Sequence, residues 1–219
     1  MTQLGIFGKH PGFADFVEAG FSESVTTKLS TWLDTSLTEI RKMCGSDWND
    51  FWDSAQALRF QIGRGVLDVG VAGILQPSRD SIGRRFPLII GSERVRISNP
   101  AVDHDQSYWE TLELHLRDVK YGNGAASLLS GLELSPESEA AEVPPNWAYR
   151  PDGDLAKLLT STIDTDWRDA MVLRSYWWSP GTPGRAAVWL GCHGLPDVEA
   201  LGMLLNGVAQ KHSQDDEVG

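Results

Sequence analysis

Lys9 follows two glycines at the end of a predicted strand. In such an arrangement, backbone N–H groups and the lysine side chain could bind phosphate groups. A nucleotide-binding loop of that kind has four residues between its glycines and a serine or threonine after its lysine. Here two residues separate Gly5 from Gly8, His10 follows the lysine, and Pro11 removes one backbone donor. The spacing therefore argues against nucleotide binding.

Motifs for nucleophilic catalysis and metal binding are missing from the sequence. It has no Gly-x-Ser-x-Gly elbow and no pair of histidines at ligand spacing. Asp103, His104 and Asp105 precede a predicted helix, where a cap and surface charges explain them most simply. Cys192 and His193 are adjacent, and adjacent side chains in a strand point to opposite faces. We therefore expect no catalytic residue, no metal site and no cofactor.

The strongest concentration of polar groups is at residues 77–87, where three arginines surround a glycine turn in an otherwise acidic protein. The guanidinium groups could bind an anion or a phosphopeptide, or they could belong to a surface for a protein partner. Alternatively, Arg79 or Arg84 pairs with a carboxylate such as Asp80 or Asp15 and pins the turn between two strands. All three interpretations stay open at the level of the sequence.

The composition limits the classes of protein that fit. The chain has 219 residues, 41% of them hydrophobic, and its 19 basic and 30 acidic side chains give a formal net charge of −11. This charge has the wrong sign for binding nucleic acid. Without a leader-like N-terminus or a long apolar run, we expect a cytoplasmic protein with no membrane insertion. Cys44 and Cys192 indicate two buried thiols, and nine tryptophans point to packing or partner binding.

Strands and helices that alternate along the chain must position these residues. Hydrophobic periodicity predicts strands at residues 3–8, 58–62 (half-buried), 66–75 and 86–90, with Gly70 and Gly73 marking a bulge or a close contact. A further strand or edge is predicted at residues 94–97, and a hairpin at 171–178 and 185–190. Several strands are joined by short turns, so we expect an α+β fold: a single domain with a central antiparallel or mixed β-sheet flanked by helices.

Helix start and stop signals complete the prediction. The clearest helix runs from the cap Ser22 to the stop at Gly45, and another runs from the cap Asp105 to the residue before Gly122. Other helices are expected at residues 48–52, 125–132, 155–163 and 198–208. Residues 133–150 read as an acidic, proline-rich loop and residues 213–219 as a disordered tail, so the domain spans residues 1–212.

Three segments together resemble the type VI secretion-associated TagF family, in its N-terminal domain. Residues 5–17 are similar to the family's opening Gly-aromatic-Gly-Lys-x-Pro…Gly-Asp-Phe pattern, with Ala14 where glycine is usual. Residues 48–60 are similar to its tryptophans leading into a Trp-Arg-Phe strand, with Leu58 in place of the last tryptophan. Residues 77–88 closely resemble its Pro-Ser-x-Asp-x-x-Gly-Arg-x-Phe-Pro-Leu signature. A later Trp-Trp strand and a Gly-Leu-Pro turn extend the resemblance over nearly the whole chain.

The resemblance implies a non-enzymatic cytoplasmic accessory protein that represses a type VI secretion system after translation, by binding the Fha protein with its forkhead-associated domain. Alternatives are a component that stays in the machine, or a small enzyme or anion- or phosphopeptide-binding module that uses Lys9 and residues 78–85. The motif residues form either the partner-binding surface or the polar contacts that hold its loops, and we favour the second role for Asp15 and Asp80. They are Lys9, Asp15, Phe16, Arg59, Pro77, Ser78, Asp80, Gly83, Arg84 and Pro87.

Overall fold

Seven strands form one sheet in the computed structural model, which describes residues 2–96, 98–101, 103–119, 122, 124–134, 136, 156–157, 171–181 and 185–206. Their order across the sheet is β2-β1-β5-β4-β3-β6-β7, and every neighbouring pair is antiparallel. The predicted α+β fold is confirmed, and the sheet is antiparallel rather than mixed. The strands are β1 (Gln3–Gly8), β2 (Val17–Ala19), β3 (Leu58–Ile62), β4 (Val71–Gln76), β5 (Leu88–Glu93), β6 (Arg174–Ser179) and β7 (Val188–His193).

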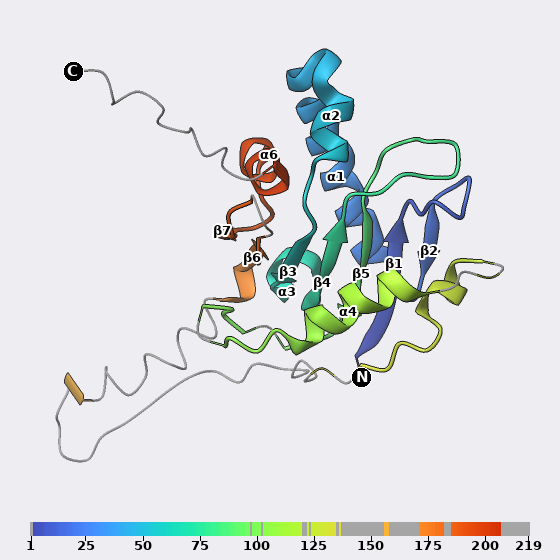
Figure 1. Cartoon of the computed structure of the whole chain (residues 1–219). Coiled ribbons are helices and arrows are strands. Elements are labelled where there is room, and N and C mark those ends of the chain that lie inside the picture. Colours follow the sequence, from blue (N-terminus) through green and yellow to red (C-terminus); the bar gives the residue numbers. More distant parts are fainter. Residues whose placement is uncertain are drawn as a thin grey trace, which may run out of the picture.

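Helices cover both faces of the sheet (Figure 1). One face packs against α1 (Glu23–Cys44), α2 (Trp48–Asp53), α3 (Arg64–Leu67) and α6 (Val198–Asn206). The other packs against α4 (Ser107–Asp118) and the 3₁₀ helix η2 (Ala125–Leu129). Two shorter 3₁₀ turns are η1 (Gly45–Asp47) and η3 (Met171–Leu173). None of the helices in the described part of the chain combines the length and the apolar character that a membrane crossing needs.

Two hydrophobic cores follow from this layering, one on each face of the sheet. Phe60 and its cross-strand neighbour Trp177 lie in the core under α1. Tyr176 and Trp178 point the other way, into the core under α4. The adjacent residues Trp177 and Trp178 are both buried, because helices cover both faces of the sheet.

The predicted helix between Ser22 and Gly45 is confirmed as α1. Gly45 ends the helix with a φ of 56°, a conformation that favours glycine. Ser22 occupies the N-cap position, but its hydroxyl donates a 2.8 Å hydrogen bond to the buried Glu93 carboxylate of β5 instead of capping the helix. Apolar side chains at helical spacing form the buried stripe Val25, Leu29, Leu33, Leu37 and Ile40.

The chain from residue 58 to 76 differs from its prediction in two ways. All five positions of β3 are buried rather than half of them, because α4 covers the face on which Arg59 lies. The predicted strand at residues 66–75 begins instead with the short helix α3. Asp68, with a left-handed φ of 68°, follows that helix, and β4 starts only at Val71.

Gly73 marks a close contact and not a bulge. It faces Gly91 across the β4–β5 pair, whose register runs without interruption from Val71 to Gln76. A Cβ atom on Gly73 would lie 2.4 Å from the Ile90 carbonyl oxygen, and one on Gly91 would lie 2.2 Å from the Ala72 carbonyl oxygen. Both contacts are far shorter than van der Waals distance, so the two central strands approach each other closely because neither residue has a side chain.

Three further predictions change in their limits or kind. Residues 94–96 form no strand, because β5 ends at Glu93 and Arg94 turns the backbone with a φ of 60°. Of the strand or edge expected at residues 94–97, the described part keeps only an isolated bridge at Val95, whose amide donates to the Gly70 carbonyl at 3.1 Å. The N-cap of α4 is Gln106 rather than Asp105, although the Asp105 carboxylate accepts a 2.9 Å hydrogen bond from the Ser107 amide. The predicted helix at 125–132 is the shorter η2.

At the C-terminal side, the predicted hairpin is confirmed as β6 and β7 and the last helix as α6. The predicted acidic loop at 133–150 lies mostly outside the described residues, as does the predicted helix at 155–163. The predicted tail at 213–219 lies wholly outside them.

Candidate functional site

Three segments that are far apart in the sequence meet at one end of the sheet: residues 9–16, helix α2 and residues 77–87 (Figure 1). We call these segments together the motif end. The Lys9 amide donates to the Pro87 carbonyl at 3.2 Å, and the Ser81 amide donates to the Phe13 carbonyl at 2.9 Å. The Trp52 indole N–H donates to the Ser78 carbonyl at 2.8 Å. Antiparallel pairing of β1 with β5, of β5 with β4 and of β4 with β3 places all three segments together.

Asp80 is the centre of the motif end. Its side chain is completely buried, and its Oδ2 accepts hydrogen bonds from Lys9 Nζ at 2.9 Å and from Arg84 Nε at 2.6 Å. Its Oδ1 accepts from the amides of Ile82 and Arg84 at 3.2 and 2.8 Å, which closes the turn at Gly83, where φ is 88°. Burial alone raises the pKa of Asp80, but the hydrogen bonds from Lys9 and Arg84 outweigh it and hold the pKa well below the usual value.

Lys9 is a buried partner of this carboxylate and not a free phosphate ligand. Its Nζ also lies 5.2 Å from the ring centroid of Phe16, within range of a cation–π contact. Phe16 in turn packs against Phe7 and Phe86, with centroid distances of 5.9 and 4.8 Å, and keeps 49% of its surface exposed. The lysine is thus enclosed between a carboxylate and an aromatic cluster.

The three arginines of the motif end have different surroundings. Arg84 pairs with Asp80, donates to the Ala14 carbonyl and lies 3.5 Å from Asp15, so the interpretation that it pins the turn agrees with the geometry. The hydrogen bond to Asp80 raises the pKa of Arg84. Arg85 holds α2 through two hydrogen bonds, of 3.0 and 2.7 Å, to Asp53, and hydrogen bonding to Arg85 lowers the pKa of that carboxyl.

Arg79 pairs with neither Asp80 nor Asp15 within salt-bridge distance; its backbone forms a bridge to Arg85. Asp15 itself is 95% exposed, and its single ion pair in the described chain is the 3.5 Å contact with Arg84. The structural role expected for Asp80 therefore has strong geometric support, whereas Asp15 contributes little to the network.

Arg59 belongs to a separate polar cluster under α4. Its guanidinium makes two hydrogen bonds, of 2.7 and 2.9 Å, to Glu113 and one of 2.9 Å to Gln106. Gln106 also accepts from the Trp178 indole at 2.8 Å. Sequence reasoning missed Glu113, although it lies four residues after the buried Trp109 and therefore on the buried stripe of the helix.

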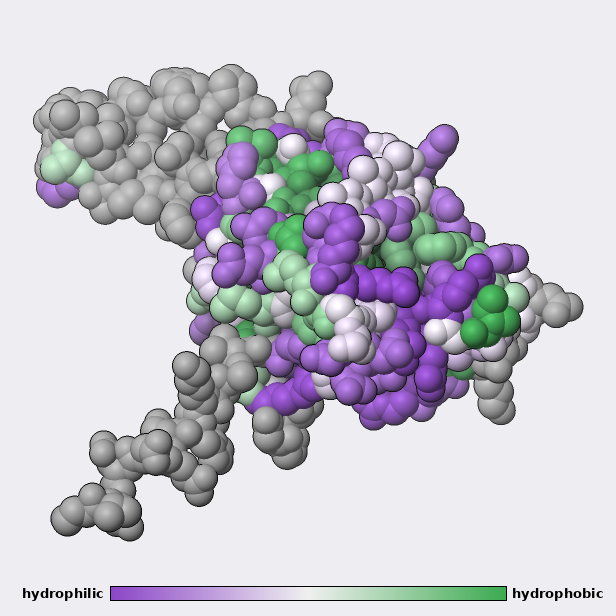
Figure 2. Space-filling model, turned by 90° about the horizontal axis from the view of Figure 1, so that it is seen from above, coloured by the Kyte–Doolittle hydropathy of each residue, from purple (hydrophilic) through white to green (hydrophobic). Residues whose placement is uncertain are grey.

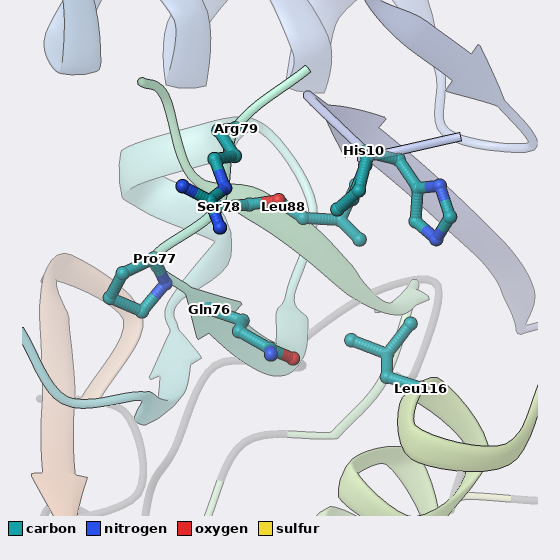
Figure 3. A pocket seen from close by; sticks show the side chains of 8 residues that line it. His10, Gln76, Pro77, Ser78, Arg79, Leu88 and Leu116 are labelled. Carbon is teal, nitrogen blue, oxygen red and sulfur yellow. The ribbon is translucent and has the colours of Figure 1, made fainter. Parts of the chain in front are cut away.

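A pocket of about 250 Å³ opens beside the motif end (Figure 3). Pro77 and Pro87 bracket the loop, and Pro77 forms part of the pocket wall. His10, also in the wall, accepts a 3.0 Å hydrogen bond from the Gly12 amide through Nδ1, and burial lowers its pKa. The full lining is His10, Pro11, Gln76, Pro77, Ser78, Arg79, Leu88 and Leu116.

Within the described part of the chain, no three histidine, cysteine or acidic side chains group in a way that could hold a metal ion. Cys44 and Cys192 are free thiols, partly rather than fully buried, and burial raises the pKa of both. Cys192 lies 3.3 Å from the Ser175 hydroxyl and is not joined to His193 by any hydrogen bond in this structure.

Comparisons with known proteins cover the three segments of the motif end. The family model described as TagF N-terminal domain, type VI secretion system-associated, matches residues 5–133, which include all three segments. The crystal structure of PA0076 from Pseudomonas aeruginosa PAO1 has a similar fold, with a TM-score of 0.73 and 22% identity over 99% of this chain and 100% of that one. No curated protein matches the sequence. Since the matched residues make up more than half of the chain, the protein belongs to the TagF N-terminal domain family, which is associated with type VI secretion.

Proposed function

We propose that this protein is a non-enzymatic cytoplasmic regulator that represses a type VI secretion system after translation by binding an Fha protein through the motif end. Family membership supports the link to type VI secretion. The observation that carries the mode of action is that the motif residues form a rigid support beneath two exposed apolar side chains, Phe16 and Ile82, which are 49% and 67% exposed.

This arrangement suits recognition for an energetic reason. Binding partners lose conformational freedom at an interface, and the loss is smaller when the contacting loops are already fixed. The Asp80 network ties the loop of Ile82 to Lys9, and Phe16 is packed between two other phenylalanines. A few large side chains on such a support can supply most of the affinity of an interface. Figure 2 shows a surface on which hydrophobic side chains lie among hydrophilic ones.

The geometry gives little support to the alternative of an enzyme or anion-binding module that uses Lys9. The cations Lys9 and Arg84 are both hydrogen-bonded to the same Asp80 carboxylate, so both already have an internal anionic partner. A substrate anion would have to displace Asp80 from a position in which its side chain is fully buried. We therefore assign no catalytic residue.

The proposal is tested by capture of purified Fha on the immobilised full chain. Replacing Phe16 and Ile82 together by serine removes both exposed apolar side chains without touching the Asp80 carboxylate. We expect at least about a tenfold loss of affinity, as for truncated residues at the centre of an interface. The matched control is Leu114→Ser, because Leu114 of α4 is similarly exposed (53%) but lies outside the motif end.

Each outcome of the capture experiment decides one part of the proposal. No capture by the wild-type chain would contradict Fha as the partner. Equal capture by the double variant and the wild type would contradict the motif end as the binding surface, and loss of binding in Leu114→Ser would move the interface to α4.

A further inference from the structure

The pocket beside the motif end has a position and a composition that the Asp80 network does not explain. It lies where the end of β1, the end of β4 and the start of β5 meet, with Leu116 of α4 as its remaining wall. Figure 3 shows Gln76, Ser78 and Leu88 around this space, with Leu116 facing them from the helix. Pro11, Pro77, Leu88 and Leu116 supply apolar walls, and the remaining lining side chains are polar.

Three of the polar side chains have hydrogen-bonding capacity that the described residues do not use. The Gln76 amide, the Ser78 hydroxyl and the Arg79 guanidinium form no hydrogen bond or ion pair with the described part of the chain. Gln76 and Arg79 are exposed, so a ligand can reach them. In contrast, the other two arginines of the motif end are each paired with an aspartate.

The charge at the pocket matches a single negative charge. Arg79 supplies one guanidinium, a fork of donors that complements a carboxylate. Burial lowers the pKa of His10 and so disfavours its positively charged form. Asp53 feels the charge of Arg79 at longer range and reduces the positive potential there, which disfavours a doubly charged phosphate relative to a carboxylate.

We propose that this pocket binds the side-chain carboxylate of a glutamate or aspartate from a protein partner. Arg79 is the anchor of the carboxylate, Gln76 and Ser78 donate further hydrogen bonds, and the leucine and proline walls contact the methylene groups of the acidic side chain. This site goes beyond the proposed function, because it recognises a chemical group, the carboxylate. Its binding does not depend on which partner protein carries that group.

The test uses small probes, so its outcome does not depend on Fha. Amide chemical shifts of the isotope-labelled full chain are followed by NMR during titration with N-acetyl-glutamate N-methylamide. We expect saturable shifts at Ser78 and Arg79, with affinity in the millimolar range that one charged pair can supply. The neutral isostere N-acetyl-glutamine N-methylamide should bind about tenfold more weakly or not at all.

Two variants distinguish binding of the probe in the pocket from non-specific attraction of the probe to an exposed arginine. Arg79→Gln should abolish the shifts caused by the glutamate probe and keep the dispersed spectrum of a folded chain, because its side chain is exposed. Arg94→Gln, at another exposed arginine outside the pocket, should bind the probe like the wild type. Equal binding of the two probes, or an unchanged titration in Arg79→Gln, would overturn the proposal. Stronger saturation by inorganic phosphate than by the glutamate probe would overturn the choice of a carboxylate.

Discussion

At the scale of single residues, Asp80 has the largest structural role in the motif end. It pairs with two cations and closes its own turn, although it lies on a loop. A buried lysine without a counter-charge is strongly unfavourable, so the partnership fixes the positions of both loops at once. Arg59 plays the corresponding part under α4, where Glu113 balances its charge.

Replacing Asp80 by asparagine should lower the thermal midpoint at neutral pH by several degrees. The variant keeps the shape of the side chain but leaves Lys9 and Arg84 without their carboxylate. The matched control is Asp15→Asn, which removes an exposed carboxylate 3.5 Å from the same arginine and should leave the midpoint unchanged. Circular dichroism melts of the two variants and the wild type measure the difference, and equal midpoints would refute the role of Asp80.

The pH dependence of that difference has a definite sign. The folded-state pKa of Asp80 lies below the value of 3.8 expected for the unfolded chain. The stabilisation by its ionised form is therefore fully present above about pH 4 and is lost as the pH falls from there through the folded-state pKa. The Asp80→Asn variant has no such contribution to lose. Melts recorded between neutral and acid pH should show its midpoint approaching that of the wild type, and a constant gap would contradict this assignment.

At the scale of elements, β4 and β5 approach each other closely and flank the loop of residues 77–87. β4 leads into the loop of residues 77–87, and β5 begins where that loop ends. Gly73 and Gly91 allow these strands to pack without a side chain between them.

Replacing Gly91 by alanine should lower the free energy of unfolding by about 1–3 kcal/mol, as overpacking of a core does. The new Cβ would lie 2.2 Å from a backbone oxygen, which cannot rotate away as a side chain could. Gly202→Ala in α6 is the control, since its Cβ has ordinary contacts inside a helix, and a gain of about 0.5–1 kcal/mol is expected there. Urea unfolding distinguishes the opposite signs; stabilisation by Gly91→Ala would show that the strands can separate at little cost.

At the scale of the whole molecule, a sheet covered on both faces presents its loops and short elements for contact with partners. The motif end gathers a polar network, two exposed apolar side chains and a pocket on one such edge. The formal charge of −11 favours solubility and disfavours binding to other acidic surfaces, so recognition has to come from local contacts.

A repressor and a structural component of the machine differ in the effect of their loss. Deleting the gene in a strain with a type VI system should raise secretion of a substrate of that system, measured in culture supernatants. Complementation with the wild-type gene should restore low secretion, and the double serine variant of Phe16 and Ile82 should fail to do so although it accumulates to the same level. Collapse of secretion on deletion would instead identify a component that the machine requires.

The sequence by itself determined the elements whose signals are local. Strand β1, helix α1 between Ser22 and Gly45, and the β6–β7 hairpin follow from periodicity, caps and turn residues within a few positions of each other. The motif segments also sufficed to indicate the family to which the chain belongs. The strand predicted at residues 66–75 was too long. The short helix α3 and Asp68, with its left-handed backbone, interrupt this apolar segment, and the sequence shows no strand-breaking residue there before Gly70.

Only the tertiary structure decided which charges pair and which faces are buried. Lys9 and Asp80 are 71 positions apart, and their contact depends on the strand order that places β1 beside β5. Arg59 is buried because α4 crosses the second face of the sheet, which alternation along β3 could not reveal. The physical reason is that backbone conformation responds to near neighbours in the chain, whereas burial and ion pairing depend on packing between elements that the sequence separates widely.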